Sequence, residues 1–126
     1  MATKVKEFSI KENVFKTETL FIFGTQEQFL EILNKRKIKP THKLDKYCVG
    51  TVVECQGKFF RIVWVERQGK SLDAIGVLIH ELMHLVVRIC ADKGVPIKAN
   101  IETGECGDET AAYLLEYYYK ECLKRL

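Results

Sequence analysis

The residues best suited to chemistry lie in one mostly apolar stretch, GVLIHELMHLVV, residues 76–87. Within it His80 and His84 are four positions apart, and Glu81 directly follows the first of them. On an α-helix, residues four apart share a face, so both imidazoles can reach one tetrahedral ion at about 2 Å. Glu81 lies roughly 100° further round the helix, where it can reach a metal-bound water. This H-E-x-x-H pattern predicts a zinc site with Glu81 as general base.

The three polar residues also have a reading without metal, as a hydrogen-bonded cluster in the core. A carboxylate and two imidazoles buried without partners each cost several kcal/mol. They therefore need shared partners, and a cation supplies one. We favour the metal site and keep the hydrogen-bonded cluster as its alternative.

A catalytic zinc site needs a third protein ligand, which the chain must supply downstream. The candidates are Glu102, Glu105, Cys106, Asp108 and Glu109. We favour Glu109, because it begins the last predicted helix and a rigid element can aim it at the two histidines. A glutamate in a first helical turn also stabilises the helix dipole, which is its alternative role. Cys106 is the main rival, since a thiolate is a good zinc ligand.

Two tyrosines follow Glu109 at helical spacing and could assist the reaction. Tyr113 and Tyr117 lie one and two turns beyond Glu109, so either hydroxyl could donate to a developing oxyanion. Packing along an amphipathic helix is the alternative. The strand predicted over 58–66 precedes the histidine helix and could, as a sheet edge, pair with an extended substrate.

The elements that must position these residues are readable from periodicity and capping signals. A strand is predicted over Thr19–Phe23, and a helix over 26–37 with Thr25 and Gln28 as a capping box. Runs over 47–54 and 58–66 predict a β-hairpin.

The histidines belong to a second predicted helix, which begins after Ser71 and ends at Gly94. This helix is apolar almost all round, which predicts a buried central helix. A third helix begins near Asp108 and runs to the C-terminus. The whole chain, 1–126, is predicted to be one α+β domain, with an antiparallel or mixed sheet packed on the active-site helix and the C-terminal helix.

Composition narrows the class of protein. With 47% hydrophobic and 29% charged residues the chain is ordinary globular material. It shows no signal peptide and no apolar run that we take as membrane-spanning. Its five cysteines form no C-x-x-C pair, which favours free thiols in the cytoplasm. The net charge of +3 and the basic cluster over 34–40 give nucleic-acid binding little support.

The motif HELMH, followed after a loop by GDETAAYLLEYY, resembles the gluzincin branch of the zincin metallopeptidases. The nearest likenesses are small zincins of the ImmA/IrrE type and short phage or prophage proteins with HExxH. The resemblance covers the chain from about Ser71 onward and rests on these two motifs. It implies a small zincin-like fold, zinc on His80, His84 and Glu109, and Glu81 as general base.

The chain departs from the family pattern at one position. Many gluzincins carry an aspartate four residues after the ligand glutamate, where this chain has Tyr113. The chain is also shorter than the peptidases that bring an oxyanion donor from a second subdomain. The sequence thus predicts a zinc-dependent metallopeptidase for a specific protein or peptide substrate. The alternative is a non-catalytic zinc-binding zincin-like protein with a structural or interaction role.

Overall fold

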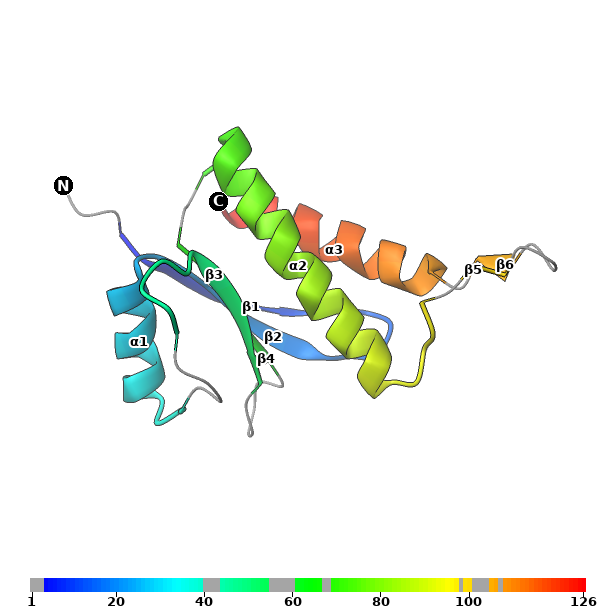
Figure 1. Ribbon diagram of the computed structural model, residues 1–126, viewed down its shortest axis with the longest axis horizontal. Helices are drawn as coiled ribbons and strands as arrows, with labels where there is room; N and C mark the ends of the chain where they lie inside the picture. The colour runs from blue at the N-terminus through cyan, green and yellow to red at the C-terminus, as the bar shows by residue number, and fades with distance from the viewer. Residues whose placement is uncertain are drawn as a thin grey trace.

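The computed structural model describes residues 4–39, 44–54, 61–66, 69–97, 99–100, 105–106 and 108–126 of the chain. It is an α+β arrangement, as predicted, and its elements follow one another in the order shown in Figure 1. They are β1 (Lys6–Lys11), β2 (Glu18–Phe23), α1 (Gln26–Lys35), β3 (Gly50–Glu54), β4 (Arg61–Val65), α2 (Leu72–Asp92), β5 (Ala99–Asn100), β6 (Glu105–Cys106) and α3 (Glu109–Arg125).

Four strands form one mixed sheet in the order β1-β2-β4-β3, and β5 pairs with β6 in a separate short ladder. The predicted hairpin is confirmed, because β3 and β4 pair antiparallel with Gly50 opposite Val65. The second hairpin strand is not a sheet edge, so the substrate pairing considered for it in that case does not apply to it. β4 pairs in parallel with β2 on its other side, so β3 and β1 are the two edges. β1 was not predicted.

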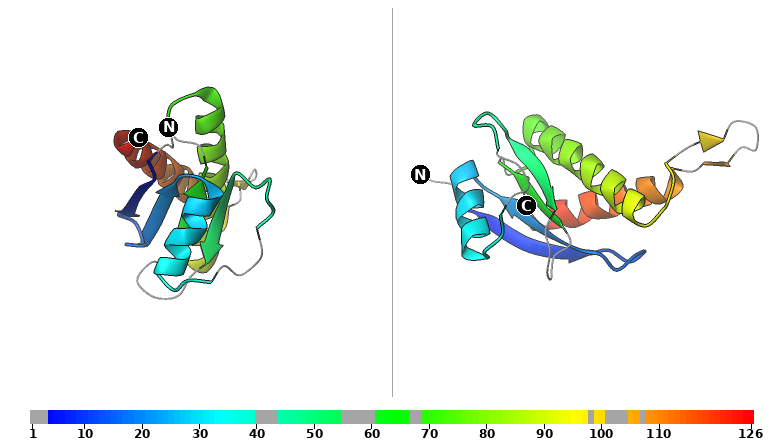
Figure 2. Two further views of the ribbon diagram at one scale, coloured as in Figure 1. Left: turned by 90° about the vertical axis from the view of Figure 1, so that its left-hand side faces the viewer. Right: turned by 60° about the horizontal axis from the view of Figure 1, so that its bottom comes forward.

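Helices cover both faces of this sheet (Figures 1 and 2). α1 packs on one face, where Phe29 stacks on Trp64 with ring centroids 5.0 Å apart. α2 and α3 pack together on the other face, over a core that includes Phe21, Leu82 and Tyr118. The predicted packing of the sheet on the histidine helix and the C-terminal helix is therefore confirmed.

The start of α1 and both ends of α2 follow the predicted capping signals, whereas Asp108 at the start of α3, also predicted as an N-cap, makes no side-chain capping bond. Thr25 and Gln28 form the capping box of α1, and the Ser71 side chain accepts from the Ala74 amide at the start of α2. At the other end of α2, Gly94 has a φ of +68° and the Val95 amide donates to the Cys90 carbonyl at 2.8 Å. This is the 6→1 bond of a Schellman motif, and it fixes the last turn of α2.

α2 is not buried all round, which corrects the expectation for this helix. One face holds core residues such as Leu82 and Leu85, whereas Ile79, Met83 and Val87 are each more than 40% exposed. The sheet and α3 cover only part of the helix among the described residues. By length and hydropathy the 21 residues of α2 could also cross a membrane. Its buried face packs as the core helix of a soluble domain does.

Candidate metal centre and adjoining cleft

His80 and His84 lie on the exposed side of α2, one turn apart, with their rings edge to face. Their Nε2 atoms are 3.2 Å apart. Two nitrogens that bind one tetrahedral zinc ion at 2.0–2.1 Å are about 3.3 Å from each other. The two imidazoles therefore already have the separation that a shared zinc ion requires, although the same distance also suits a hydrogen bond between neutral rings.

Glu81 points in a different direction, into the space between α2 and the edge strand β3. Its side chain is only 6% exposed and lies against Gly50, the first residue of β3. A Cβ at position 50 would be 2.9 Å from Glu81 Cγ and 3.0 Å from Oε2. A side chain at this point of β3 would therefore displace the carboxylate. Burial raises the pKa of the Glu81 carboxyl, and the positive charges of His80, His84 and Arg88 partly oppose this shift.

A cleft of about 540 Å³ opens beside these groups, between the start of β3 and the first turns of α2. Both His80 and Glu81 line it. The rest of the lining comes from Tyr47, Cys48, Val49, Gly50, Leu72, Asp73, Gly76 and Val77. The candidate metal ligand and the candidate base therefore share one cavity that a small substrate segment can enter.

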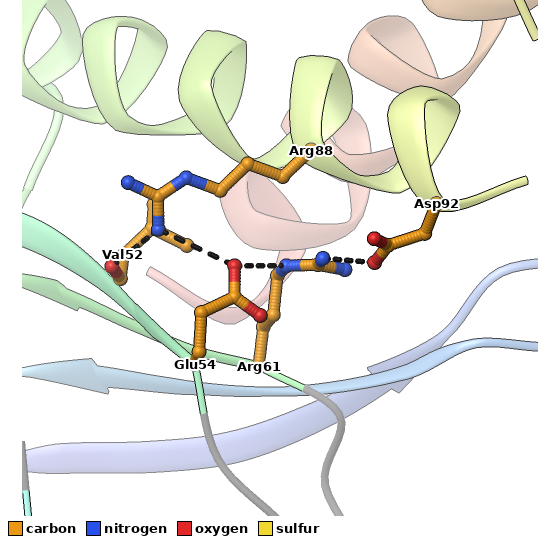
Figure 3. A network of polar contacts seen from close by, with 5 residues as sticks. All are labelled: Val52, Glu54, Arg61, Arg88 and Asp92. Carbon is orange, nitrogen blue, oxygen red and sulfur yellow. Dashed lines mark hydrogen bonds and ion pairs between the residues drawn. The ribbon is translucent and has the colours of Figure 1, made fainter. Parts of the chain in front are cut away.

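Further along the same gap, a network of charged residues joins α2 to β3 and β4 (Figure 3). Arg61 of β4 is almost fully buried, and it bonds Glu54 of β3 at 3.0 Å and Asp92 at the end of α2. Arg88 of α2 donates from Nη1 to the Val52 carbonyl at 2.8 Å and lies 3.6 Å from Glu54. These contacts fix the distance between α2 and the edge strand.

Glu109, the predicted third ligand, is an exposed residue at the start of α3. Figures 1 and 2 show that this end of α3 lies beside the C-terminal end of α2, whereas the histidines lie near its middle. Among the described residues, no three His, Cys, Asp or Glu side chains form a group that could hold a metal ion. The side chains of the rivals Glu105 and Cys106 lie outside the described part of the chain.

Of the two remaining candidates, the structure describes only Asp108. Glu102 lies outside the described residues, and Asp108 occupies the N-cap position of α3 without a side-chain capping bond. The role of Glu109 as third ligand therefore stays a prediction.

The two tyrosines proposed as oxyanion donors face a different part of the molecule from Glu81. Tyr113 is 45% exposed and stacks on Tyr117, with ring centroids 6.4 Å apart. The Tyr117 hydroxyl donates to the Lys11 carbonyl of β1 at 3.4 Å. β1 and β3 are opposite edges of the sheet, and Glu81 contacts β3. A catalytic role for Tyr113 stays a prediction.

Sequence reasoning did not identify Gly50 and Arg88 as parts of the site. Arg88 follows His84 by one helical turn, so its spacing was a usable signal. Gly50 precedes a run of β-branched residues, and a glycine in a strand can mark the close approach of another group. Its contact with Glu81 depends on tertiary packing and had no local signal.

Comparison of the chain with protein-family models, with curated proteins and with solved structures finds no match. The likeness to zincins therefore rests on the two motifs and on the geometry of His80, Glu81 and His84.

Proposed function

We propose that this protein is a zinc-dependent metallopeptidase that acts on a protein or peptide substrate. The observation that carries the proposal is the 3.2 Å separation of the His80 and His84 Nε2 atoms, with the Glu81 carboxylate held beside them at the edge of a cleft. The imidazoles fit a zinc ion, because nitrogen ligands and this separation match its preferences. Glu109 is the proposed third ligand.

Zinc held there would supply Lewis acidity toward a water molecule and toward a peptide carbonyl. Glu81 would take the proton of the attacking water and deliver it to the leaving amine. Its contact with Gly50 would hold the carboxylate at the cleft while the reaction proceeds. The substrate backbone would lie along β3, the edge strand on the cleft side.

The cytoplasm is the proposed location. Cys48, Cys90 and Cys122 are free thiols, and two of them are buried. Free thiols are usual in a reducing compartment.

The test compares the wild-type protein with Glu81→Gln, both loaded with zinc and supplied with a mixture of peptides. We expect about one zinc per chain in both proteins, with peptide cleavage by the wild type only. Equal cleavage by both would show that Glu81 is not the base. Zinc retention with no cleavage by either protein, and a lower melting temperature after chelation, would support the non-catalytic alternative instead.

A further inference from the structure

The backbone groups of the edge strand are not equally open to a substrate. The Glu66 amide donates to the Val49 carbonyl at 2.9 Å, which sets the phase of the ladder between β3 and β4. Because inward and outward groups alternate in an antiparallel pair, the N–H and C=O groups of Gly50, Val52 and Glu54 point away from β4. A peptide added to this edge would bond to these groups.

Two of these outward carbonyls already have partners in the protein. The Cys48 thiol donates to the Gly50 carbonyl at 2.9 Å. Arg88 donates from Nη1 to the Val52 carbonyl at 2.8 Å, so a substrate amide cannot bond there without displacing it. An added strand that starts at Gly50 therefore meets the Arg88 guanidinium two residues further along. The peptide-binding part of the edge ends at a fixed positive charge.

The guanidinium keeps donors for a ligand. Arg61 takes the closer contact with Glu54, at 3.0 Å, and also bonds Asp92, whereas Arg88 has only the longer 3.6 Å contact with Glu54. Among the described residues no partner binds Nε or Nη2 of Arg88, and its side chain is 40% exposed. In Figure 3 this side chain extends away from Asp92, toward the N-terminal half of α2.

We propose that Arg88 binds a carboxylate of the substrate and thereby determines which peptides enter the cleft. This inference rests on the proposed function, since it assigns the substrate class of the same site. A guanidinium presents a planar fork of donors that matches a carboxylate, which a lysine does not. The carboxylate has two possible sources. One is an acidic side chain on either side of the cleaved bond, and the other is the free C-terminus of the peptide.

A purely structural role for Arg88 predicts something different. If Arg88 only fixes α2 to β3, its removal lowers the stability of the fold. It then weakens the binding of acidic and neutral peptides by the same factor. If Arg88 binds a carboxylate, its removal abolishes the preference of the protein for acidic over neutral peptides. The ratio of two affinities therefore separates the roles, even where a variant is less stable.

The experiment measures binding of short N-acetylated peptides to zinc-loaded Glu81→Gln protein in about 0.15 M salt. In one set, all peptides have an amidated C-terminus, and each peptide with a single Asp or Glu is compared with the same peptide carrying Asn or Gln at that position. A second, neutral set differs only in a free or amidated C-terminus. We expect one set to bind about tenfold more tightly in its carboxylate form. The set that does so identifies the source of the carboxylate.

Added to this background, Arg88→Met should abolish the preference, and Arg88→Lys should retain only part of it. The matched control is Arg36→Met, which removes a similarly exposed arginine at the C-cap of α1, the helix on the other face of the sheet. It should leave the preference intact. Three results would overturn the inference. They are equal affinity for the acid and amide forms in both sets, a preference that survives Arg88→Met, and no peptide binding at all.

Cleavage of the preferred peptides by the wild-type protein is measured separately. Selective binding through Arg88 without cleavage would refute the peptidase and leave the carboxylate site standing. Cleavage without selective binding would support the peptidase and refute the carboxylate site at Arg88.

Discussion

Gly50 of the edge strand and Glu81 of the central helix are in such close contact that a side chain at residue 50 would collide with the Glu81 side chain. Any Cβ at residue 50 would be 3.1 Å or less from three atoms of the Glu81 side chain. The first residue of β3 thus forms the wall that holds the carboxylate. A close approach of this kind requires a residue without a side chain.

Gly50→Ala should therefore impair catalysis without loss of zinc. The added methyl group forces the Glu81 carboxylate away from its position, and a displacement of about 1 Å can lower kcat about a hundredfold. The three atoms nearest to the added methyl group all belong to Glu81 and none to an imidazole, so zinc content should be unchanged. Steady-state kinetics and metal analysis on the same sample check both expectations.

Thr51→Ala is the control, because it changes the next residue of β3 without adding bulk toward α2. It should keep most of the activity. Full activity in Gly50→Ala would mean that the Glu81 position seen here is not the one used in catalysis.

His80→Ala and His84→Ala should each abolish tight zinc binding, because the 3.2 Å pair then loses one of its two nitrogens. In the wild type, zinc at a hundred times its Kd should stabilise the folded state by about 2.7 kcal/mol, and this gain should vanish in both variants. Thermal melts with and without zinc measure it. Zinc-dependent stabilisation that persists in both variants would place the metal elsewhere.

The features predicted from sequence are those that depend on neighbours within one or two helical turns. The histidine spacing, the Thr25 and Ser71 caps and the Gly94 stop involve contacts of five residues or fewer, and each is present in the structure. Their physics is local, so one sequence suffices to locate them.

The features that were missed or wrong depend on contacts between distant residues. Which hairpin strand forms the edge depends on β2 pairing with β4, which brings Leu20 opposite Ile62. The exposure of Met83 depends on how far α3 covers α2. The contact of Arg88 with Val52 spans 36 positions in the chain. Hydrophobic periodicity carries no information about such pairings.

Thiol reactivity should follow burial. Burial raises the pKa of Cys122 to about 12 and raises that of Cys90, so neither forms appreciable thiolate at pH 8 in the folded protein. Cys48 is only half-buried, at the cleft. Maleimide should therefore label Cys48 first, and the other two only after denaturation.

Mass spectrometry after timed labelling reads out this order. A variant with Cys55→Ser and Cys106→Ser removes the thiol of Cys55, which lies outside the described residues, and that of Cys106, whose side chain is not described. Labelling of Cys122 in the folded protein at the rate of Cys48 would contradict the burial argument.

Asp92→Ala should destabilise the fold by about 1–3 kcal/mol, because it removes an acidic partner of the buried Arg61. Arg61 joins β4 to the end of α2, so the loss acts on the helix that carries the histidines. Urea denaturation of the zinc-free protein measures the change in free energy of unfolding. Glu116→Ala is the matched control, since it breaks the exposed pair with Lys120 and should leave the free energy of unfolding almost unchanged. Equal effects of the two substitutions would mean that the Arg61 network contributes no more than a surface ion pair.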